Sequence, residues 1–597
     1  MSTPETIEFK IAQSVSEAFK SLYGADLAPA DVQVQETRKE FEGEFTVVVF
    51  PFLRLSKRSP EQTATDIGEY LKNHLGELQS FQVVKGFLNL RMTAGFWTEV
   101  LKGMYAAEDY GCAPRNSKGL VLVEYASPNT NKPLHLGHLR NIFLGDSVSN
   151  ILLAAGHQVQ RVQIINDRGI HICKSMVAWQ KFAEGATPQS TGTKGDHFVG
   201  EYYVRFDREY KRQVAELVDG GMDEETAREQ APIMVEARES LVKWEEKEPE
   251  TYALWERMNG WVYEGFDATY ARMGVEFDKL YYESDTWSVG KEVVLKGLEQ
   301  GVFTKKEDGS VWADLSDRGL DQKLLLRKDG TTVYITQDLG TAILRYRDFP
   351  ELTRMIYTVG NEQEYHFKVL FLILEKLGYD WAENCHHLSY GMVELPEGKM
   401  KSREGTVVDA DDMMDEMVRT ARTVTEELGK LDGMEVGQQA ELYEIIGLAA
   451  LKYFLLKVDP VKNMLFDPVE SIDFNGHTGP FIQYTHARIK SVLRHFDTPP
   501  VIETAPDEMS KYERTIIADL HRFPQVIAEA AETRNPARLA NYLYDLVKDF
   551  NAFYQNVSIL KADTHTDKIF RTVMAATVAK VIHDGMAMLG IRVPERM

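Results

Sequence analysis

The segment from Ser127 to Asn141, SPNTNKPLHLGHLRN, holds the side chains of this sequence that are best suited to chemistry. Two histidines, His135 and His138, stand three positions apart with Gly137 between them, and Lys132 comes just before. On the first turn of a helix the two rings can face the same way, and glycine leaves room for a flat base or a phosphate to approach the backbone. Histidine and lysine can neutralise charge on phosphate oxygens. The segment therefore predicts a nucleotide site.

The neighbouring sequence predicts the elements that would hold this site. A strand-like run, GLVLVEY, comes immediately before it, a helical pattern extends from Leu136 to Gly156, and a second strand-like run, QVQRVQIIND, follows. A strand, a helix and a strand within about 45 residues are typical of a parallel crossover, in which the helix N-terminus faces anions at the carboxyl edge of the sheet. The alternative is a pair of capping or core-edge histidines, because H-x-G-H alone is a short motif.

The rest of the chain alternates between strand and helix patterns and then becomes helical. Residues 1–115 predict a small α+β domain, and residues 185–265 are charged and favour helix, as expected of an insertion. The run LLLRKDGTTVYIT predicts a hairpin that turns at Asp329-Gly330, and two further strands are expected at TRMIYTVG and CHHLSYGMVEL. Helices are expected after about residue 420. The predicted domains are 1–115, 116–420 with the insertion, and 421–597.

Composition limits the classes of protein to which the chain can belong. It has 597 residues and ordinary globular composition, and its start has no basic region followed by an apolar run, so a cytoplasmic protein without a membrane segment is expected. Its three cysteines are widely spaced, which argues against a disulfide framework or a zinc site. The net charge of −23 argues against non-specific nucleic-acid binding, so a polyanionic partner would need a local basic surface.

The longer segment EYASPNTNKPLHLGHLRN resembles the ATP-binding signature of class I aminoacyl-tRNA synthetases, and most closely that of the arginine-specific family. The resemblance extends over most of the chain, except the insertion. It includes NDRGIH from Asn166, VYITQD from Val333, KMKSREGTVVDADD from Lys399, TGPFIQYTHARI from Thr478 and the ending LGIRVPERM. It implies a Rossmann-type α/β catalytic domain between an N-terminal α+β domain and a C-terminal all-helical anticodon-binding domain.

The resemblance also implies the reaction. The carboxylate of L-arginine attacks the α-phosphate of ATP, pyrophosphate leaves, and the 3′ end of tRNA(Arg) then displaces AMP, with Mg²⁺ as the cofactor and no protein metal ligands. His135, Gly137 and His138 would bind ATP together with Lys399 and Met400. The second signature departs from the family pattern, since it reads KMKSR, so its second lysine is either Lys401 or is replaced by Lys132.

An arginine pocket requires a carboxylate that can accept a guanidinium group in two places. Asp338 is the candidate, and it lies four residues after Tyr334, so both side chains fall on one side of a helical turn and the ring can pack on the guanidinium plane. The alternative is that both residues only cap a helix. The resemblance adds the remaining pocket residues: Glu124, Asn129, His135 and Gln363.

The resemblance assigns tRNA binding to both ends of the chain. The C-terminal candidates are Arg488, Lys490 and Arg494, each of which could instead be an ordinary surface charge, and the N-terminal candidates in GFLNL are Phe87 and Asn89. A monomer is expected. Two alternatives stay open: another class I member or a smaller nucleotidyl transferase without the tRNA-binding helical domain, and a catalytically silent paralogue that still binds tRNA. Exchange of pyrophosphate into ATP, measured with and without tRNA, separates them.

Overall fold

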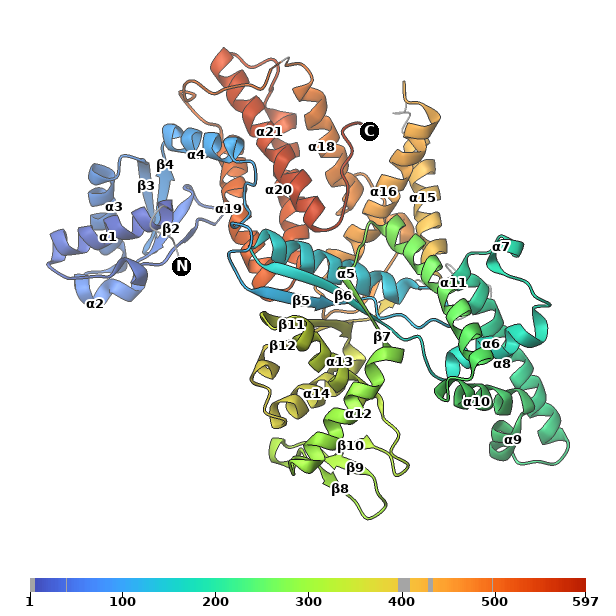
Figure 1. The fold of residues 1–597 in the computed structure, drawn as a ribbon. Helices are drawn as coiled ribbons and strands as arrows, with labels where there is room; N and C mark the ends of the chain where they lie inside the picture. The colour runs from blue at the N-terminus through green and yellow to red at the C-terminus, as the bar shows by residue number, and fades with distance from the viewer. Residues whose placement is uncertain (1–5, 39, 396–407, 428–432, 497) are drawn as a thin grey trace. The chain divides into compact units, whose positions relative to one another are not determined.

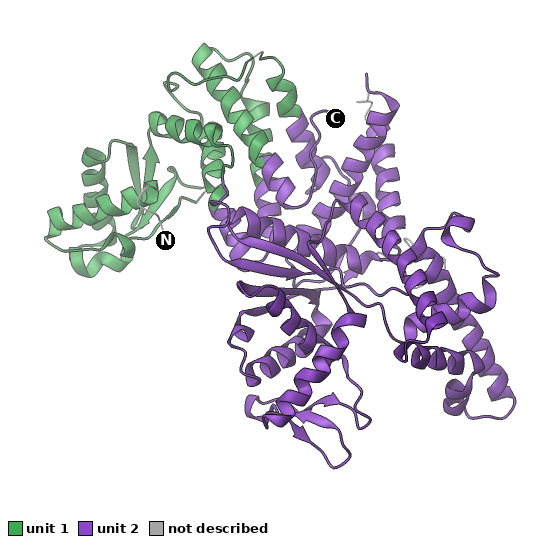
Figure 2. Cartoon of the chain, in the orientation of Figure 1, with its two compact units in different colours: residues 1–110, 488–524, 545–581 green, residues 111–487, 525–544, 582–597 purple. Residues whose placement is uncertain are grey.

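A computed structural model describes residues 6–38, 40–395, 408–427, 433–496 and 498–597. Two compact units are seen in it (Figure 2). Unit 1 consists of residues 1–110, 488–524 and 545–581, and unit 2 consists of residues 111–487, 525–544 and 582–597. The three-domain division at 115 and 420 stays a prediction.

The N-terminal part of unit 1 is an α+β fold, as predicted. Its four-stranded antiparallel sheet has the order β1-β2-β4-β3. The strands are β1 (Val34–Glu36), β2 (Phe45–Val48), β3 (Leu78–Val84) and β4 (Phe87–Met92), and the helices are α1 (Ile7–Tyr23), α2 (Leu53–Ser56), α3 (Pro60–His74) and α4 (Ala94–Ala106). Side-chain hydroxyls cap α1, α3 and α4 at Thr6, Ser59 and Thr93.

The centre of unit 2 is a five-stranded sheet of order β12-β11-β5-β6-β7 in which every pair is parallel. Its strands are β5 (Leu120–Glu124), β6 (Gln158–Ile165), β7 (Lys279–Tyr282), β11 (Leu352–Gly360) and β12 (Cys385–Tyr390). The predicted crossover is confirmed, because α5 (Leu136–Ala154) connects β5 to its neighbour β6. Gly156 follows the helix with φ 91°, where a residue with a side chain would be strained.

Helices cover both faces of this sheet (Figure 1). Helix α5 lies on one face, and α12 (Glu283–Glu299), α13 (Tyr334–Asp348) and α14 (Glu364–Lys376) lie on the other. Apolar residues of α13 and α14, such as Leu339 and Leu370, share a core with Leu122 and Met355 of the strands. The sheet is thus buried on both sides, which is typical of parallel α/β sheets.

The region predicted as a helical insertion is helical. Between β6 and β7 the chain forms α6 (Ile170–Phe182), α7 (Pro188–Thr191), α8 (Gly195–Asp219), α9 (Glu224–Gln230), α10 (Pro232–Glu245) and α11 (Pro249–Met273). Val177 and Phe206 pack with Ile233 and Ala237 in a core of their own.

The predicted hairpin over residues 324–336 is wrong. Strand β10 (Lys323–Leu326) and the turn at Gly330 are present, but the return is a single bridge from Leu326 to Thr332, and α13 then begins at Tyr334. The hydroxyl of Thr336 bonds to the Leu325 carbonyl at the start of this helix. Strand β10 also does not join the parallel sheet, since it pairs with β9 (Val311–Ala313) and, through it, with β8 (Thr304–Lys305).

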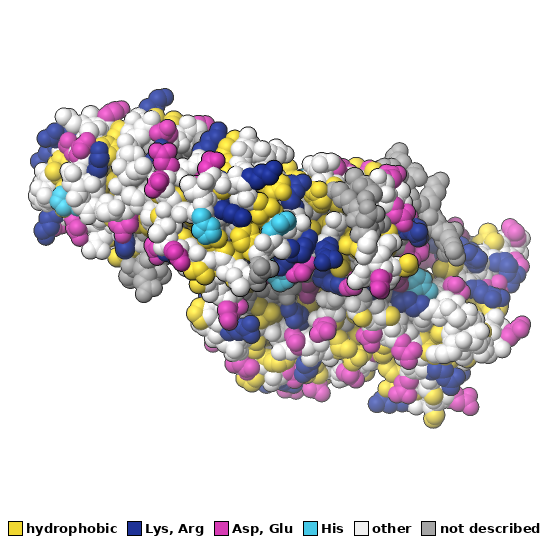
Figure 3. All heavy atoms as spheres, turned by 90° about the horizontal axis from the view of Figure 1, so that it is seen from above, with side chains coloured by type: hydrophobic (Ala, Val, Ile, Leu, Met, Phe, Trp, Pro, Cys, Tyr) yellow, Lys and Arg dark blue, Asp and Glu magenta, His cyan; other side chains and the backbone are white. Residues whose placement is uncertain are grey.

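The C-terminal region is helical apart from the two-residue β14 (Met464–Leu465), which pairs with β13 (Val393–Glu394). Its helices are α15 (Ala410–Glu427), α16 (Val436–Leu456), α17 (Pro468–Ser471), α18 (Gly479–Leu493), α19 (Lys511–Thr533), α20 (Pro536–Asn556) and α21 (His565–Met588). None of the helices in the described ranges is long and apolar enough to cross a membrane. Acidic and basic side chains are interspersed over the face drawn in Figure 3, so that face is not uniformly acidic despite the net charge of −23.

Candidate active site

The two histidines of the motif cap the first turn of α5. The Gly137 N–H donates to Nδ1 of His135 over 3.2 Å, and the His135 N–H donates to Nδ1 of His138 over 3.1 Å. The ring centroids lie 3.9 Å apart. Because each Nδ1 accepts a hydrogen bond, the proton of each neutral ring is on Nε2. Both rings can therefore donate an Nε2–H bond to an anion.

Both imidazoles are neutral at physiological pH. Burial, together with the nearby Lys132 ammonium, lowers the pKa of His135 to about 4. Burial lowers the pKa of His138 well below its ordinary value, and the neighbouring His135 and Lys132 add to this effect. A neutral donor keeps its proton when a phosphate is bound, so these rings stabilise phosphate oxygens by hydrogen bonding.

Within the described part of the motif, Lys132 provides a positive charge, and its side chain is exposed. Its charge also contributes to the lowered pKa of His171, after burial and the charge of Lys174. His171 lies in the first turn of α6, and its Nδ1 is 3.0 Å from the Tyr203 hydroxyl. The Lys132 charge thus lowers the pKa of three histidines: His135, His138 and His171.

The first two turns of α5 are bonded to described residues on either side of the segment 396–407. On one side, the Leu136 N–H donates to the Val408 carbonyl over 3.0 Å, and the Ala410 N–H donates to the Leu134 carbonyl over 2.9 Å. On the other side, buried Arg140 donates to four backbone carbonyls, those of Gly391, Met392, Pro460 and Lys462. The predicted ATP-site residues Lys399, Met400 and Lys401 lie outside the described residues.

The backbone between β5 and the motif has an unusual conformation. Ala126 and Ser127 have φ values of 76° and 30°, in the left-handed region that residues with side chains rarely adopt. Asn141 of α5 stabilises this turn, since its Oδ1 accepts the Ala126 N–H over 2.6 Å and its Nδ2 donates to the Thr358 carbonyl of β11 over 2.7 Å. Such strain is frequent at functional sites.

Asp338 and Tyr334 both lie in the first turns of α13, as the spacing predicts. One carboxylate oxygen of Asp338 is 2.6 Å from Nε2 of His366, and its side chain remains 40% exposed. The Tyr334 ring is 80% exposed, so it is available to a ligand. Gln363, just before α14, is exposed as well.

A second carboxylate, missed in the sequence, interacts electrostatically with Asp338. Glu283 is the first residue of α12, directly after β7. Burial raises the pKa of Glu283 to about 7, with the carboxylates of Asp167 and Asp338 adding to the increase and Arg168 opposing it. The Asp338 charge disfavours ionisation of Glu283, and a bound cation would relieve that repulsion. The pair is therefore suited to a guanidinium group.

Glu124 and Asn129 differ in their surroundings. Glu124 is buried at the end of β5, where it forms an ion pair with the fully buried Arg345. Its Oε1 accepts a hydrogen bond of 3.2 Å from the Ser127 hydroxyl, so any substrate contact of Glu124 would have to be made at Oε1. Asn129 is exposed and pairs with Asn166 after β6.

Three family models together match most of the chain. Residues 101–468 match the model described as tRNA synthetases class I (R), catalytic domain. Residues 7–92 match the arginyl tRNA synthetase N terminal domain, and residues 482–597 match the DALR anticodon binding domain. The chain belongs to the arginyl-tRNA synthetase family. The smaller nucleotidyl transferase considered from the sequence is thereby ruled out.

Members of the arginyl-tRNA synthetase family match the chain over its whole length. An arginine–tRNA ligase of Bacteroides fragilis is 56% identical over 596 residues, covering 99% of this chain and 100% of the relative. An arginine–tRNA ligase of Porphyromonas gingivalis is 52% identical over 595 residues, covering 98% and 99%. The structure of Thermus thermophilus arginyl-tRNA synthetase matches with a TM-score of 0.77 and 26% identity, covering 99% and 100% of the two chains.

The candidate tRNA-binding residues lie in unit 1. Phe87 is half-buried, and its ring packs on Phe50 with centroids 5.2 Å apart. Asn89 is only 2% exposed and accepts a hydrogen bond from Thr46, so direct contact with tRNA does not fit its burial.

The C-terminal candidates lie on α18 and just beyond its end. Arg488 donates to Asn551 over 2.7 Å and stacks over the Tyr554 ring. Lys490 is half-buried, and Arg494 is exposed. Of the three, Arg494 is the most accessible to a phosphate group.

Sequence reasoning missed three residues that shape the site: Glu283, Asn141 and Arg140. The signal for Glu283 was its position, because a carboxylate directly after a parallel strand lies at the ligand-binding edge of the sheet. The signal for Asn141 and Arg140 was their polarity on a helix whose other residues are mostly apolar, since polar groups inside a core need defined partners.

Proposed function

We propose that this chain is an arginine–tRNA ligase, which forms arginyl-adenylate from L-arginine and ATP and transfers the arginine to the 3′ end of tRNA(Arg) in protein synthesis. The observation that supports it is the pair of carboxylates, Asp338 and Glu283, in the same parallel-sheet unit as the two neutral histidines. One end of the site suits a guanidinium group, and the other suits the phosphates of ATP.

In this proposal the guanidinium group of arginine lies between Asp338 and Glu283, with the Tyr334 ring packed on its plane. His366, close to Asp338, orients that carboxylate. Gln363, Asn129 and His135 contact the rest of the amino acid, and Glu124 contributes through its Oε1. These further contacts follow the family resemblance.

At the phosphate end, His135 and His138 donate their Nε2–H groups to ATP oxygens, and Gly137 allows the close approach. Lys132 stabilises the leaving pyrophosphate together with Lys399 and Lys401, which are outside the described residues. The charges that shift the pKa of His135 and His138 are cationic, and no carboxylate is among them. In this proposal Mg²⁺ arrives bound to ATP, where it neutralises phosphate charge.

The proposal places tRNA(Arg) on the N-terminal region, through Phe87, and on the C-terminal helices, through Arg488, Lys490 and Arg494. Asn89 would act only indirectly, by fixing β4 against β2. The domains are those expected from the sequence, 1–115, 116–420 and 421–597, and the protein acts as a cytoplasmic monomer.

Substitution of the two carboxylates tests the arginine pocket. Asp338→Asn is expected to raise the KM for arginine by about 10- to 100-fold, because a hydrogen bond to a charged group contributes about 1.5–3 kcal/mol, while the KM for ATP changes little. Glu283→Gln is expected to raise the arginine KM and to remove the fall in that KM as the pH rises through about 7, where Glu283 ionises.

The control is Asp348→Asn at the other end of α13, where the carboxylate pairs with Lys279 over 2.6 Å. Its KM values should match those of the wild type. Equal increases in the KM values for arginine and ATP in Asp338→Asn would contradict the pocket assignment.

A further inference from the structure

The first turns of α8, in the helical insertion, lie against the residues that build the phosphate site. A Cβ atom added to Gly200 would lie 2.9 Å from Cδ of Pro133 and 3.6 Å from Cα of Lys132, so only glycine allows this approach without movement. Helix α8 is thus packed directly on the segment that carries Lys132 and leads to His135.

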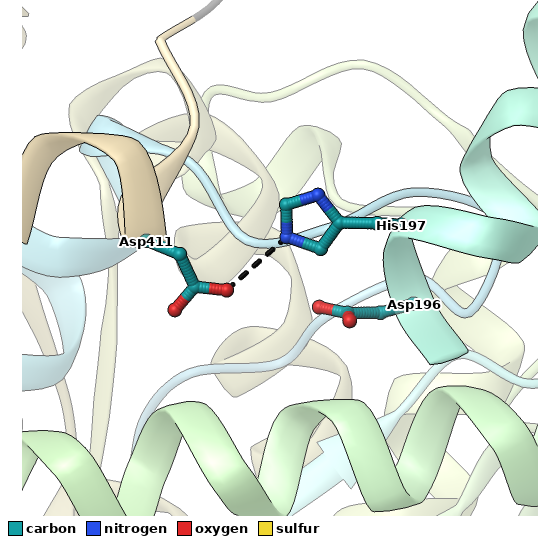
Figure 4. A group of neighbouring side chains, drawn as sticks. All are labelled: Asp196, His197 and Asp411. Carbon is teal, nitrogen blue, oxygen red and sulfur yellow. Dashed lines mark hydrogen bonds and ion pairs between the residues drawn. The ribbon is translucent and has the colours of Figure 1, made fainter. Parts of the chain in front are cut away.

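A cluster of charged side chains joins the same end of α8 to the start of α15 (Figure 4). Nε2 of His197 is 3.1 Å from Oδ2 of Asp411 and 3.6 Å from Oδ2 of Asp409. Nζ of Lys194 is 2.6 Å from the same oxygen of Asp411 and 3.2 Å from the buried Asp196. Thr269 of α11 donates to Asp411 over 3.2 Å.

The arrangement of Asp196, His197 and Asp411 would suit a metal ion by ligand type. The Lys194 ammonium, however, already provides a cation in contact with two of these carboxylates. An ammonium group and a divalent ion at the same oxygens repel each other. The cluster is therefore a network of ion pairs that connects two elements.

The α15 end of this network is bonded to the motif itself. Asp409 pairs with His135 in an antiparallel bridge, and its neighbours Val408 and Ala410 bond to Leu136 and Leu134. Oδ1 of Asp409 also accepts the Asp411 N–H over 2.8 Å. A shift of Asp409 or Asp411 would therefore displace the backbone of His135.

We propose that His197 and Lys194 are positioning residues for adenylate formation, through which the helical insertion holds Asp409 and Asp411 and, with them, the backbone of His135. This inference rests on the proposed function, since it concerns the same phosphate site. It also gives the insertion a role in the chemistry in addition to any contact with tRNA.

The network depends on the charge of His197. Its hydrogen bond to Asp411 and the charges of Asp409 and Asp196 raise the pKa of His197, against burial and the Lys194 charge. Protonated His197 forms ion pairs with Asp411 and Asp409 at low pH. These pairs are lost as the pH rises through the pKa of His197, which lies above the ordinary value of about 6.5. Positioning by His197 should weaken over the same range.

The test is His197→Asn in the full-length chain, assayed by ATP–pyrophosphate exchange with saturating tRNA(Arg), from pH 6 to pH 9. The kcat is expected to fall by about tenfold at pH 6.5, as for a small displacement of a reacting group, with the KM for arginine within about twofold of the wild-type value. In the wild type, kcat should decrease as the pH rises and His197 loses its proton. This decrease should be absent in His197→Asn.

The matched control is Asp415→Asn, one turn further along α15, which breaks an ion pair of 2.7 Å between Asp415 and Arg272 of α11. It removes a charged contact between the same two regions without touching residues 408–411. The inference is wrong if His197→Asn has the same kcat and pH profile as this control. It is also wrong if the wild type binds one Zn²⁺ that His197→Asn does not bind. Absence of exchange in the wild type would instead contradict the proposed function.

Discussion

At the residue scale, the motif places two neutral hydrogen-bond donors, His135 and His138, next to the exposed ammonium group of Lys132. Burial keeps His135 and His138 uncharged, and their Nδ1 atoms accept backbone N–H bonds, so the Nε2–H groups are fixed before a ligand arrives. Donors that need no reorganisation are effective in stabilising developing charge. Lys132 provides the positive charge next to these donors.

Lys132→Ala tests this division of roles. Adenylate formation is expected to slow by about tenfold or more, because a charge-assisted contact to phosphate is lost, while the arginine KM stays nearly unchanged. Rapid-quench measurement of the first turnover gives the rate directly. Lys118→Ala, an exposed lysine before β5, is the control and should behave as the wild type. Wild-type kinetics in Lys132→Ala would transfer the role to Lys401.

The sequence predicted the positions of several of these residues in the helices of the structure. Two histidines after a strand, and an aspartate four residues after a tyrosine, lie where the pattern places them. Glu283 could not be predicted in the same way, because its interaction with the Asp338 charge joins positions 55 apart in the chain and arises only in the fold.

At the element scale, α5 connects the parts of the site. Its N-terminus presents the histidines, its second turn holds the segment before residue 396 through Arg140, and its start pairs with residues 408–410. The glycine of the motif is part of this arrangement, since a Cβ atom at Gly137 would lie 3.0 Å from Cε1 of His135.

Gly137→Ala should therefore displace the His135 ring and lower the kcat for adenylate formation by about tenfold or more. Thermal stability should remain equal or rise, because alanine is the better helix former by up to about 1 kcal/mol. Gly95→Ala is a matched control, since Gly95 is also the second residue of its helix and its added Cβ meets open space. Equal kcat values in the two variants would show that the ring position is unimportant.

The elements were predicted with one error that has a physical cause. The run VYIT is rich in β-branched and aromatic residues, which favour a strand, but it lies at the start of α13. Ile335, Leu339 and Ile343 have helical spacing and are buried in the core, so packing decides the structure against local preference.

At the scale of the whole molecule, the chain combines a nucleotide-binding sheet with an N-terminal α+β region and C-terminal helices. The overall composition predicted this poorly, because a net charge of −23 conceals where the basic residues lie. The arrangement into two units was also not predicted, since unit 1 is assembled from three separate stretches of the chain.

In the proposed function, the sheet edge activates the amino acid whose guanidinium group Asp338 and Glu283 select. The most direct measurement is the charging of tRNA(Arg) by the full-length chain with ATP and Mg²⁺, with each proteinogenic amino acid supplied in turn. We expect arginine, and no other amino acid, to be esterified to the tRNA. Charging with a different amino acid, or with none, would contradict it.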